Sequence, residues 1–307
     1  MSALTRRGLF GLTVLGGVSA LTACGSSGSD GSGASPSAPA AAGASGGPTG
    51  SGRVNVLYAG SLVNLMEKQL GPAFATATGY TFAGFGAGST ALAAQIKGKV
   101  RKADVFVSAS PKADEALMGA GNGDWVRWYV TYANSPLVLG YNPRSTFVDE
   151  IKTGPWYDAI TRDGVRVGTT DPKTDPKGKL AAQALADTGK QHPKLLDIAR
   201  DDKTIFPEET LVADLQSGQL DAGFFYSSEA KAAGIPTVPL AGVSLQATYT
   251  VTVLKDAPNA AGAEAFVTYL LGPAGTTVLR QDGYELTTPP KVTGTGVPAA
   301  IRKVIGA

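Results

Sequence analysis

The chain has 307 residues, of which 43% are hydrophobic and 17% charged, a balance typical of a globular protein long enough for two domains. Its net charge is +2, and it has no Lys/Arg-rich run interleaved with aromatic residues, so nothing indicates a nucleic-acid partner. One His and one Cys are too few for the usual zinc sites or for a cysteine nucleophile with its histidine base.

The first 24 residues have the pattern of an export signal. A basic start, MSALTRR, precedes a short apolar and small-residue core at 8–21, which is too short to span a membrane comfortably as a helix. The segment 21–25, LTACG, resembles the lipobox of bacterial lipoproteins, which implies that Cys24 is acylated and becomes the mature N-terminus. Arg6-Arg7 resembles a twin-arginine export signal, and both export routes stay open.

Residues 25–52 are almost entirely Gly, Ser, Ala, Pro and Thr, a composition with too little apolar surface to fold. They are expected to form a flexible tether with a reach of roughly 30 Å. The folded part is therefore expected outside the cell, held to the outer face of the membrane by a lipid.

From Val54 onward, short apolar runs alternate with helical patterns, which predicts an α/β fold. In the first series we expect strands at 54–58, 80–85 and 103–110, a helix at 62–77 that ends at Gly79, a second helix around Leu92, Ala93 and Ile96, and a helix opened by Pro111. A strand pair interrupted at Asn134-Ser135-Pro136 is expected within 128–143. The second series predicts strands at 165–170, 220–226, 235–240 and 245–255, and helices from about Lys177, at 207–218 and within 261–285.

Two α/β series indicate two lobes with a cleft between them. We assign 53–134 and 244–307 to lobe 1 and 135–243 to lobe 2, with hinge strands near 132–137 and 242–248, in a chain expected to be a monomer. In open sheets of this kind, ligands bind where loops leave the carboxyl ends of the strands.

Enzyme signatures are missing from the sequence. No G-x-S-x-G occurs in the part expected to fold, Ser89 stands where a dinucleotide motif needs its third glycine, and there is no Walker A motif. His192 lies in KQHPK and is expected to be a solvated turn residue. The acids of DPKTDP and PEE are common as turn and first-turn helix residues, so we expect neither catalysis nor a resident cofactor.

The sequence Ala-Gly-Ser occurs twice between a predicted strand and a predicted helix, in YAGSL at 58–62 and GAGST at 86–90. Alone, each serine is expected to be a helix N-cap. Together, Ser61 and Ser89 add hydroxyl donors to the exposed N–H groups of two helix starts, which bind anions readily.

Three helix starts in the second series offer the facing half of such a site. Asp175 is a plausible N-cap, with Pro176 at the first helical position and Lys177 in the first turn. FPEET opens a helix whose first-turn amides include that of Thr210, and FFYSSEA leads from a strand through Tyr226 into another helix. Five helix starts on two lobes favour an oxyanion held by several neutral donors.

These motifs, with LQSGQLDAGFFYSSEA and FVTYLLGPAG, resemble the solute-binding proteins of ABC importers for molybdate and tungstate, from Val54 to about Tyr284. The resemblance implies a type II periplasmic-binding-protein fold and delivery of the ligand to a permease and ATPase complex. It implies a bare oxyanion bound by the Ser61 and Ser89 hydroxyls, by backbone N–H groups near Lys177 and Thr210, and at the Tyr226 position. The Lys177 side chain need not point inward.

One position departs from the tungstate-binding branch, which has a glutamate where this chain has Phe225 and pairs it with an aspartate to reach the metal. Asp175 best matches that aspartate, with Asp171 the weaker match, so six-coordinate binding is not expected. No metal is expected beyond that of the oxyanion. The alternatives are the same fold binding sulfate, thiosulfate or phosphate, and, from a different class, a surface adhesion module without a small ligand.

Overall fold

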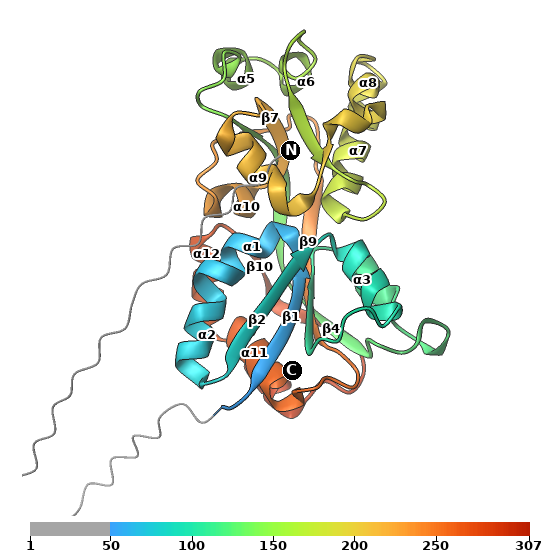
Figure 1. Cartoon of the computed structure of the whole chain (residues 1–307), viewed down its shortest axis with the longest axis vertical. Helices are drawn as coiled ribbons and strands as arrows, with labels where there is room; N and C mark the ends of the chain where they lie inside the picture. Colours follow the sequence, from blue (N-terminus) through green and yellow to red (C-terminus); the bar gives the residue numbers. More distant parts are fainter. Residues whose placement is uncertain (1–49) are drawn as a thin grey trace, which may run out of the picture. The chain divides into compact units, whose positions relative to one another are not determined.

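The structure is a computed structural model in which residues 50–307 are described. The predicted signal peptide, Cys24 and the linker up to residue 49 lie outside the described residues, and those interpretations stay predictions. The described part alternates strands and helices along the chain, and Figure 1 shows a twisted sheet with helices packed on it. The predicted α/β class is therefore confirmed.

Ten strands of the described part form one sheet. Their bounds are β1 Arg53–Ala59, β2 Thr81–Ala87, β3 Val105–Ser108, β4 Trp128–Tyr141, β5 Val167–Thr170, β6 Ile205–Phe206, β7 Ala222–Tyr226, β8 Thr237–Pro239, β9 Gln246–Val253 and β10 Glu285–Gly294. Their order is β2-β1-β3-β9-β4-β7-β5-β6, and β8 and β10 also pair with β4. β1 is parallel to β2 and β3, and β5 is parallel to β6 and β7, as expected for two α/β series.

The helices between the strands include short 3₁₀ and π segments. The α-helices are α1 Val63–Leu65, α2 Gly71–Thr78, α3 Ser89–Lys97, α4 Pro111–Glu115, α5 Val148–Thr153, α6 Trp156–Ala159, α7 Pro176–Gly189, α8 Leu195–Arg200, α9 Glu208–Ser217, α10 Ser227–Ala232, α11 Ala260–Leu271, α12 Pro273–Gln281 and α13 Ala299–Ile305. The 3₁₀ helices are η1 Gly60–Leu62, η3 Ala120–Asn122 and η4 Asp202–Thr204, and η2 Met66–Leu70 is a π-helix.

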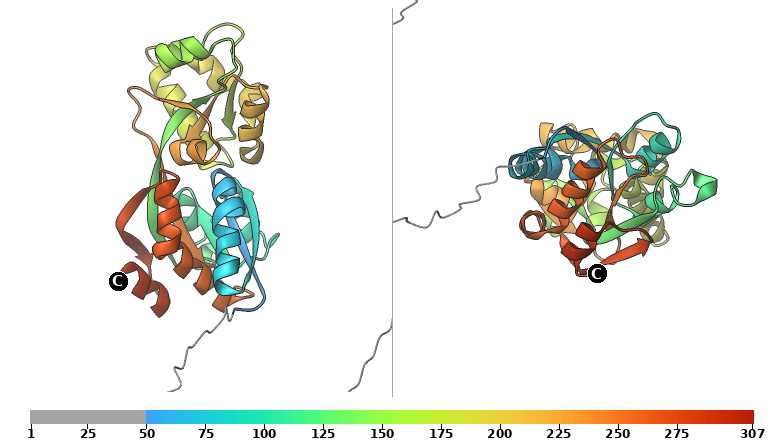
Figure 2. Two further views of the ribbon diagram at one scale, coloured as in Figure 1. Left: turned by 90° about the vertical axis from the view of Figure 1, so that its left-hand side faces the viewer. Right: turned by 90° about the horizontal axis from the view of Figure 1, so that it is seen from below.

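The sheet has two halves that meet along β4. We call β1, β2, β3, β9, β10 and the start of β4 the β1 half, and β5 to β8 with the end of β4 the β7 half. Helices α2, α3 and α11 contact strands of the β1 half, and α7, α9 and α10 contact strands of the β7 half. Helices α7 and α9 also contact β9 and β2 of the β1 half. In Figures 1 and 2, β4 runs from one group of helices to the other.

Strand β4 is one continuous strand, so the predicted interruption at Asn134-Ser135-Pro136 is wrong. Its first part pairs with β9 and β10 up to Pro136, and from Leu137 it pairs with β7 and β8. Pro136 has no N–H to donate, and it lies at the last β9 pair, where the partners of β4 change. The proline therefore marks a change of pairing partner rather than an end of the strand.

The helix predicted at 62–77 is present as a continuous run of η1, α1, η2 and α2. Its apolar face is buried as the spacing predicts, except that Ala73 is half-buried and Ala77, in the last turn, is exposed. Pro72 supplies no N–H to the preceding turn, and the π segment ends at Leu70, two residues before it. Gly79 ends the run with φ 82°, a left-handed conformation that glycine adopts without steric cost.

The core follows both faces of the sheet. Alternate residues of β7 enter different apolar clusters: Phe224 and Tyr226 join the largest one, while Phe225 packs with Leu211 and Leu215 of α9. The carboxyl ends of β1, β2, β5 and β7 lead into η1, α3, the turn before α7, and α10. The predicted site residues therefore lie near the carboxyl ends of strands in both halves.

Candidate functional site

Ser61 and Ser89 lie inside the first turns after β1 and β2, not at the N-cap positions. Ala59, with ψ 135°, is the N-cap of η1, and Gly88, with ψ 131°, is the N-cap of α3. An N-cap residue has non-helical backbone angles, and both serines come after that residue. The interpretation of each serine as a cap is therefore wrong.

Ser61 is buried at a point where the two halves touch. The backbone N–H groups of Gly60 and Ser61 donate to the two carboxylate oxygens of Glu208, over 2.8 and 2.9 Å. The Ser61 Oγ lies 3.4 Å from the Tyr249 hydroxyl oxygen. A Cβ added to Gly60 would lie 2.6 Å from the Glu208 Oε2 atom, so this close approach uses the missing side chain. The β1 half thus presents two converging N–H donors to an acidic side chain of the β7 half.

Ser89 is fully buried at the start of α3. Its Oγ accepts a hydrogen bond from the Ala109 N–H at 3.1 Å, which leaves the hydroxyl hydrogen able to donate elsewhere. In the same turn, the Ala91 N–H donates to the Thr174 carbonyl of the β7 half at 3.0 Å. A Cβ added to Gly88 would lie 2.5 Å from that carbonyl oxygen. The second Ala-Gly-Ser segment therefore also lies against the β7 half.

Asp175 is the N-cap of α7, as predicted, and Pro176 is the first helical residue. The Asp175 Oδ1 accepts a hydrogen bond from the Lys177 N–H at 2.9 Å. Asp171, the weaker candidate, closes the preceding turn: its carboxylate accepts from the Lys173 N–H and from the Thr174 hydroxyl, at 2.8 and 3.2 Å. Both aspartates thus have a local structural role at this helix start.

The Lys177 side chain is fully buried, whereas the expectation is that Lys177 acts through its amide and that its side chain need not point inward. The ammonium donates to both carboxylate oxygens of Glu229, at 2.8 and 2.9 Å, and lies 3.7 Å from the Glu208 Oε1 atom. It also lies 5.5 Å from the ring centre of Phe225 and 5.9 Å from that of Tyr226. A buried ammonium requires such partners, because water no longer solvates it.

The charges of this cluster shift one another's pKa. Burial lowers the pKa of Lys177, but Glu229, Glu208 and Asp175 outweigh burial and hold it above its ordinary value. The pKa of Glu208 stands well above its usual range, because burial and the neighbouring Asp175 disfavour its charge more than Lys177 favours it. With all three carboxylates ionised, one ammonium faces three negative charges.

Glu208 and Glu229 were missed by the sequence reasoning. The motif PEE predicts a pair of ordinary first-turn acids, and nothing local distinguishes such an acid from one that crosses to another lobe. On the same helix, Thr210 is exposed and its N–H donates to the Pro207 carbonyl at 3.1 Å. The residue of α9 that contacts the β1 half at Gly60 and Ser61 is Glu208. The role predicted for the Thr210 amide stays a prediction.

Tyr226 ends β7 with a fully buried side chain. Its backbone N–H donates to Glu229 at 3.2 Å, and its ring lies 6.1 Å from that of Tyr249. Its hydroxyl has no hydrogen-bond partner among the described residues. Burial raises the pKa of this hydroxyl well above its ordinary value, with Asp175, Glu208 and Glu229 adding to the effect. A buried hydroxyl donor thus stands among the acids of the site.

Phe225, the position that departs from the tungstate branch, packs against the apolar side chains of α9 rather than standing free. A Cβ added to Gly140 would lie 2.6 Å from its ring, which shows how closely β4 covers it. The chain therefore places an apolar ring beside Lys177 where that branch has a carboxylate.

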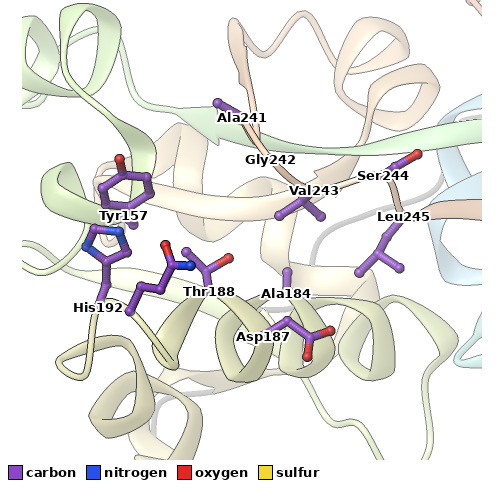
Figure 3. Close-up of a pocket in the computed structure, with 11 residues that line it drawn as sticks. Tyr157, Ala184, Asp187, Thr188, His192, Ala241, Gly242, Val243, Ser244 and Leu245 are labelled. Atoms are coloured by element: carbon purple, nitrogen blue, oxygen red, sulfur yellow. The ribbon is translucent and has the colours of Figure 1, made fainter.

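A separate pocket of about 530 Å³ lies between α7 and the segment 241–245 (Figure 3). None of the six predicted ligand-binding residues lines it. His192 lies at its edge with its ring stacked on Tyr157 at 3.8 Å, so it is half-buried rather than a solvated turn residue. This pocket is distinct from the cluster around Lys177.

Within residues 50–307, no helix is long and apolar enough to cross a membrane. Over the same residues, no group of three or more His, Cys, Asp or Glu side chains is arranged to hold a metal ion. The acids around Lys177 therefore do not form a metal site of that kind.

Residues 54–285 match the family model of bacterial extracellular solute-binding proteins. The chain belongs to this family. An uncharacterized solute-binding protein of Petrotoga mobilis is 29% identical over 280 residues, covering 78% of this chain and 86% of the relative. The molybdate/tungstate-binding protein WtpA of Thermococcus kodakarensis is 27% identical over 259 residues, covering 67% of this chain and 72% of the relative.

Among solved structures, the fold of this solute-binding protein resembles that of the Azotobacter vinelandii periplasmic molybdate-binding protein. The TM-score is 0.62 at 25% identity, over 76% of this chain and 99% of the other. The sulfate-binding protein SubI of Mycobacterium tuberculosis has the same fold, with a TM-score of 0.56 at 16% identity, over 82% and 90% of the two chains. The predicted type II periplasmic-binding-protein fold is thus confirmed.

Proposed function

We propose that this solute-binding protein captures molybdate or tungstate outside the cell and delivers it to the permease and ATPase of an ABC importer. The observation that carries the proposal is the convergence of the Gly60 and Ser61 N–H groups on two oxygens of one carboxylate. An oxyanion presents a similar pair of oxygens, and N–H donors at a strand-to-helix junction stabilise such a charge. The name of the Thermococcus relative supports the choice of oxyanion.

The donors proposed for the oxyanion are neutral. They are the Ser61 and Ser89 hydroxyls, the N–H groups at the starts of η1 and α3, and the Tyr226 hydroxyl, with the backbone near Lys177 and Thr210 facing them. Neutral donors can bind a dianion, and because they carry no charge, the site without its ligand holds no unpaired buried cation. In this role the chain needs no resident cofactor, and we assign it no catalytic activity.

The proposed mode of binding is closure of two lobes on the oxyanion, 53–134 with 244–307 against 135–243. The segments 132–137 and 242–248, which belong to or lead into β4 and β9, would absorb the motion. The Gly60–Glu208 and Ala91–Thr174 hydrogen bonds are contacts that such a motion would break and remake.

Membrane attachment is proposed through a lipid on Cys24, with residues 25–52 as the tether and the lobes acting as a monomer. Replacing Cys24 with Ala should release the chain from the membrane fraction while leaving oxyanion binding intact. Retention of the Cys24→Ala chain in washed membranes would contradict lipid anchoring at this residue.

The test of the ligand is calorimetric titration of the full chain, purified in detergent, with molybdate, tungstate, sulfate, thiosulfate and phosphate. We expect tight 1:1 binding of the first two and weak or no binding of the others. Absence of binding heat with molybdate and tungstate would refute the proposal. Tight binding of sulfate, thiosulfate or phosphate instead would assign the same fold to another oxyanion.

A further inference from the structure

Glu208 is held by hydrogen bonds from the opposite half of the molecule. It is the first residue of α9, the residue is 4% exposed, and its Oε2 and Oε1 atoms accept from the Gly60 and Ser61 N–H groups. The donors lie 148 and 147 residues away in the chain. A carboxylate that meets two backbone N–H groups in this way occupies the donors that the proposed function gives to the oxyanion.

The Lys177 ammonium does not hold Glu208 as it holds Glu229. Its hydrogen bonds go to both oxygens of Glu229, and its distance to Glu208 is 3.7 Å. Asp175, the other acid of the cluster, accepts from the Lys177 N–H within its own helix start. Glu208 is therefore the acid of this cluster whose hydrogen bonds come from the β1 half, and it is the one most easily exchanged for another anion.

We propose that Glu208 is an internal competitor that holds the Gly60 and Ser61 N–H groups until an oxyanion displaces it, and so sets the affinity threshold of the site. The inference rests on the proposed function. One pair of N–H groups cannot bind a carboxylate and an oxyanion at full strength together. Two negative charges that meet the same pair of N–H groups also repel each other. Anions that bind weakly fail to displace Glu208, and anions that bind strongly succeed.

Displacement becomes easier when Glu208 is neutral. The groups facing its carboxylate are Lys177 of α7, Asp175 at the N-cap of α7, Glu229 of α10, Tyr226 of β7 and the N–H groups of η1. Burial and the neighbouring Asp175 raise the pKa of Glu208, so this carboxyl is protonated at a higher pH than an exposed glutamate. A neutral carboxyl accepts N–H hydrogen bonds more weakly than a carboxylate does, so wild-type affinity is expected to rise as the pH is lowered.

The first test is calorimetry of the full chain with sodium molybdate at pH 8, 7 and 6. Glu208→Gln keeps the shape but removes the charge, Glu208→Ala removes the carboxyl group, and Glu285→Gln changes an exposed glutamate of β10 as the control. At pH 7 both Glu208 variants are expected to bind at least tenfold more tightly than wild type, with a flattened pH dependence, and the control within twofold. Equal or weaker binding by both Glu208 variants would overturn the inference.

The second test needs no ligand. Hydrogen exchange of the Gly60 and Ser61 amides, measured without added anion, is expected to be at least tenfold faster in Glu208→Ala than in wild type and unchanged in Glu285→Gln. Equal exchange in wild type and Glu208→Ala would show that Glu208 does not hold these amides, and the inference would fall even if molybdate binds.

The two tests also separate this inference from the proposed ligand. In one outcome, molybdate and tungstate bind no variant, but amide exchange is faster in Glu208→Ala and sulfate or phosphate binds this variant more tightly than wild type. That outcome would support Glu208 as the competitor and refute the proposed ligand. If none of these four anions binds any variant, both fall.

Discussion

The two sides of the candidate site use different chemistry. The β1 side offers the N–H groups of Gly60 and Ser61 and the Ser61 and Ser89 hydroxyls, which are neutral. The β7 side buries a lysine among three acids, Asp175, Glu208 and Glu229. Neutral donors keep their hydrogen-bonding capacity over the working pH range, whereas the buried charges depend on one another. In the proposed function, the β1 side would therefore donate the hydrogen bonds to an anion, and Glu208 of the β7 side would control when those donors are available.

The largest effect is expected on the charged side. Lys177→Met should lower the free energy of unfolding by about 3–5 kcal/mol, because it leaves the buried carboxylate of Glu229 without its ion-pair partner. Urea unfolding of the full chain at pH 7 measures this. Lys179→Met, on the same helix but exposed, is the matched control and should change stability by less than about 0.5 kcal/mol. Equal stability of the two variants would show that Lys177 is not the counter-charge of the cluster.

A buried acid away from the site tests whether charge control is special to the β7 side. Asp114 of α4 accepts a hydrogen bond from the Thr250 hydroxyl at 2.5 Å, and burial raises its pKa to about 8. The folded state keeps this proton to higher pH than the unfolded chain does. The contribution of Asp114 to the free energy of unfolding is therefore fully present below about pH 4. It falls as the pH rises to 8, by at most about 1.4 kcal/mol per pH unit.

Asp114→Asn should remove this component of the pH dependence, measured by urea unfolding at pH 5, 6, 7 and 8. The exposed Asp163→Asn should keep the wild-type profile. A profile unchanged in Asp114→Asn would mean that the β7 acids dominate the pH dependence and would strengthen the contrast between the two sides.

On the neutral side, the effect should appear in binding rather than in stability. Ser61→Ala and Ser89→Ala should each weaken molybdate binding by roughly 10- to 100-fold, since a hydrogen bond to a charged group contributes about 1.5–3 kcal/mol. Calorimetry measures the affinity, and Ser217→Ala, an exposed serine of α9, should bind as wild type. If both variants bind molybdate with wild-type affinity but have a lower free energy of unfolding, these serines have a structural role only.

The smallest expected change is at Tyr226, where the two sides meet. Tyr226→Phe should leave the free energy of unfolding within about 0.5 kcal/mol of wild type, because the hydroxyl has no partner among the described residues. Molybdate affinity should fall about tenfold if that hydroxyl donates to the oxyanion. Reduced stability with unchanged affinity would place the hydroxyl in the fold and not in the site.

Much of the fold could be predicted, because its signals are local. Apolar spacing, Gly79 and Pro111 place the first helices and their ends, and Asp175-Pro176 places the start of α7. The same local signals fail at β4, where Asn134-Ser135-Pro136 predicts a break that the strand does not have. Whether a proline ends a strand depends on what pairs beside it, and those partners come from distant segments.

The sequence by itself determined that strand ends in this chain carry small residues and serines followed by helices, because backbone conformation and helix starts depend on neighbouring residues. Only the tertiary structure decided that Glu208 meets Gly60 and Ser61 and that the Lys177 ammonium is buried with Glu229. The local sequence around a glutamate after Pro207 is the same whether its carboxylate faces water or a distant N–H group. Its partner is fixed by how the sheet brings the two halves together, and no local pattern records that.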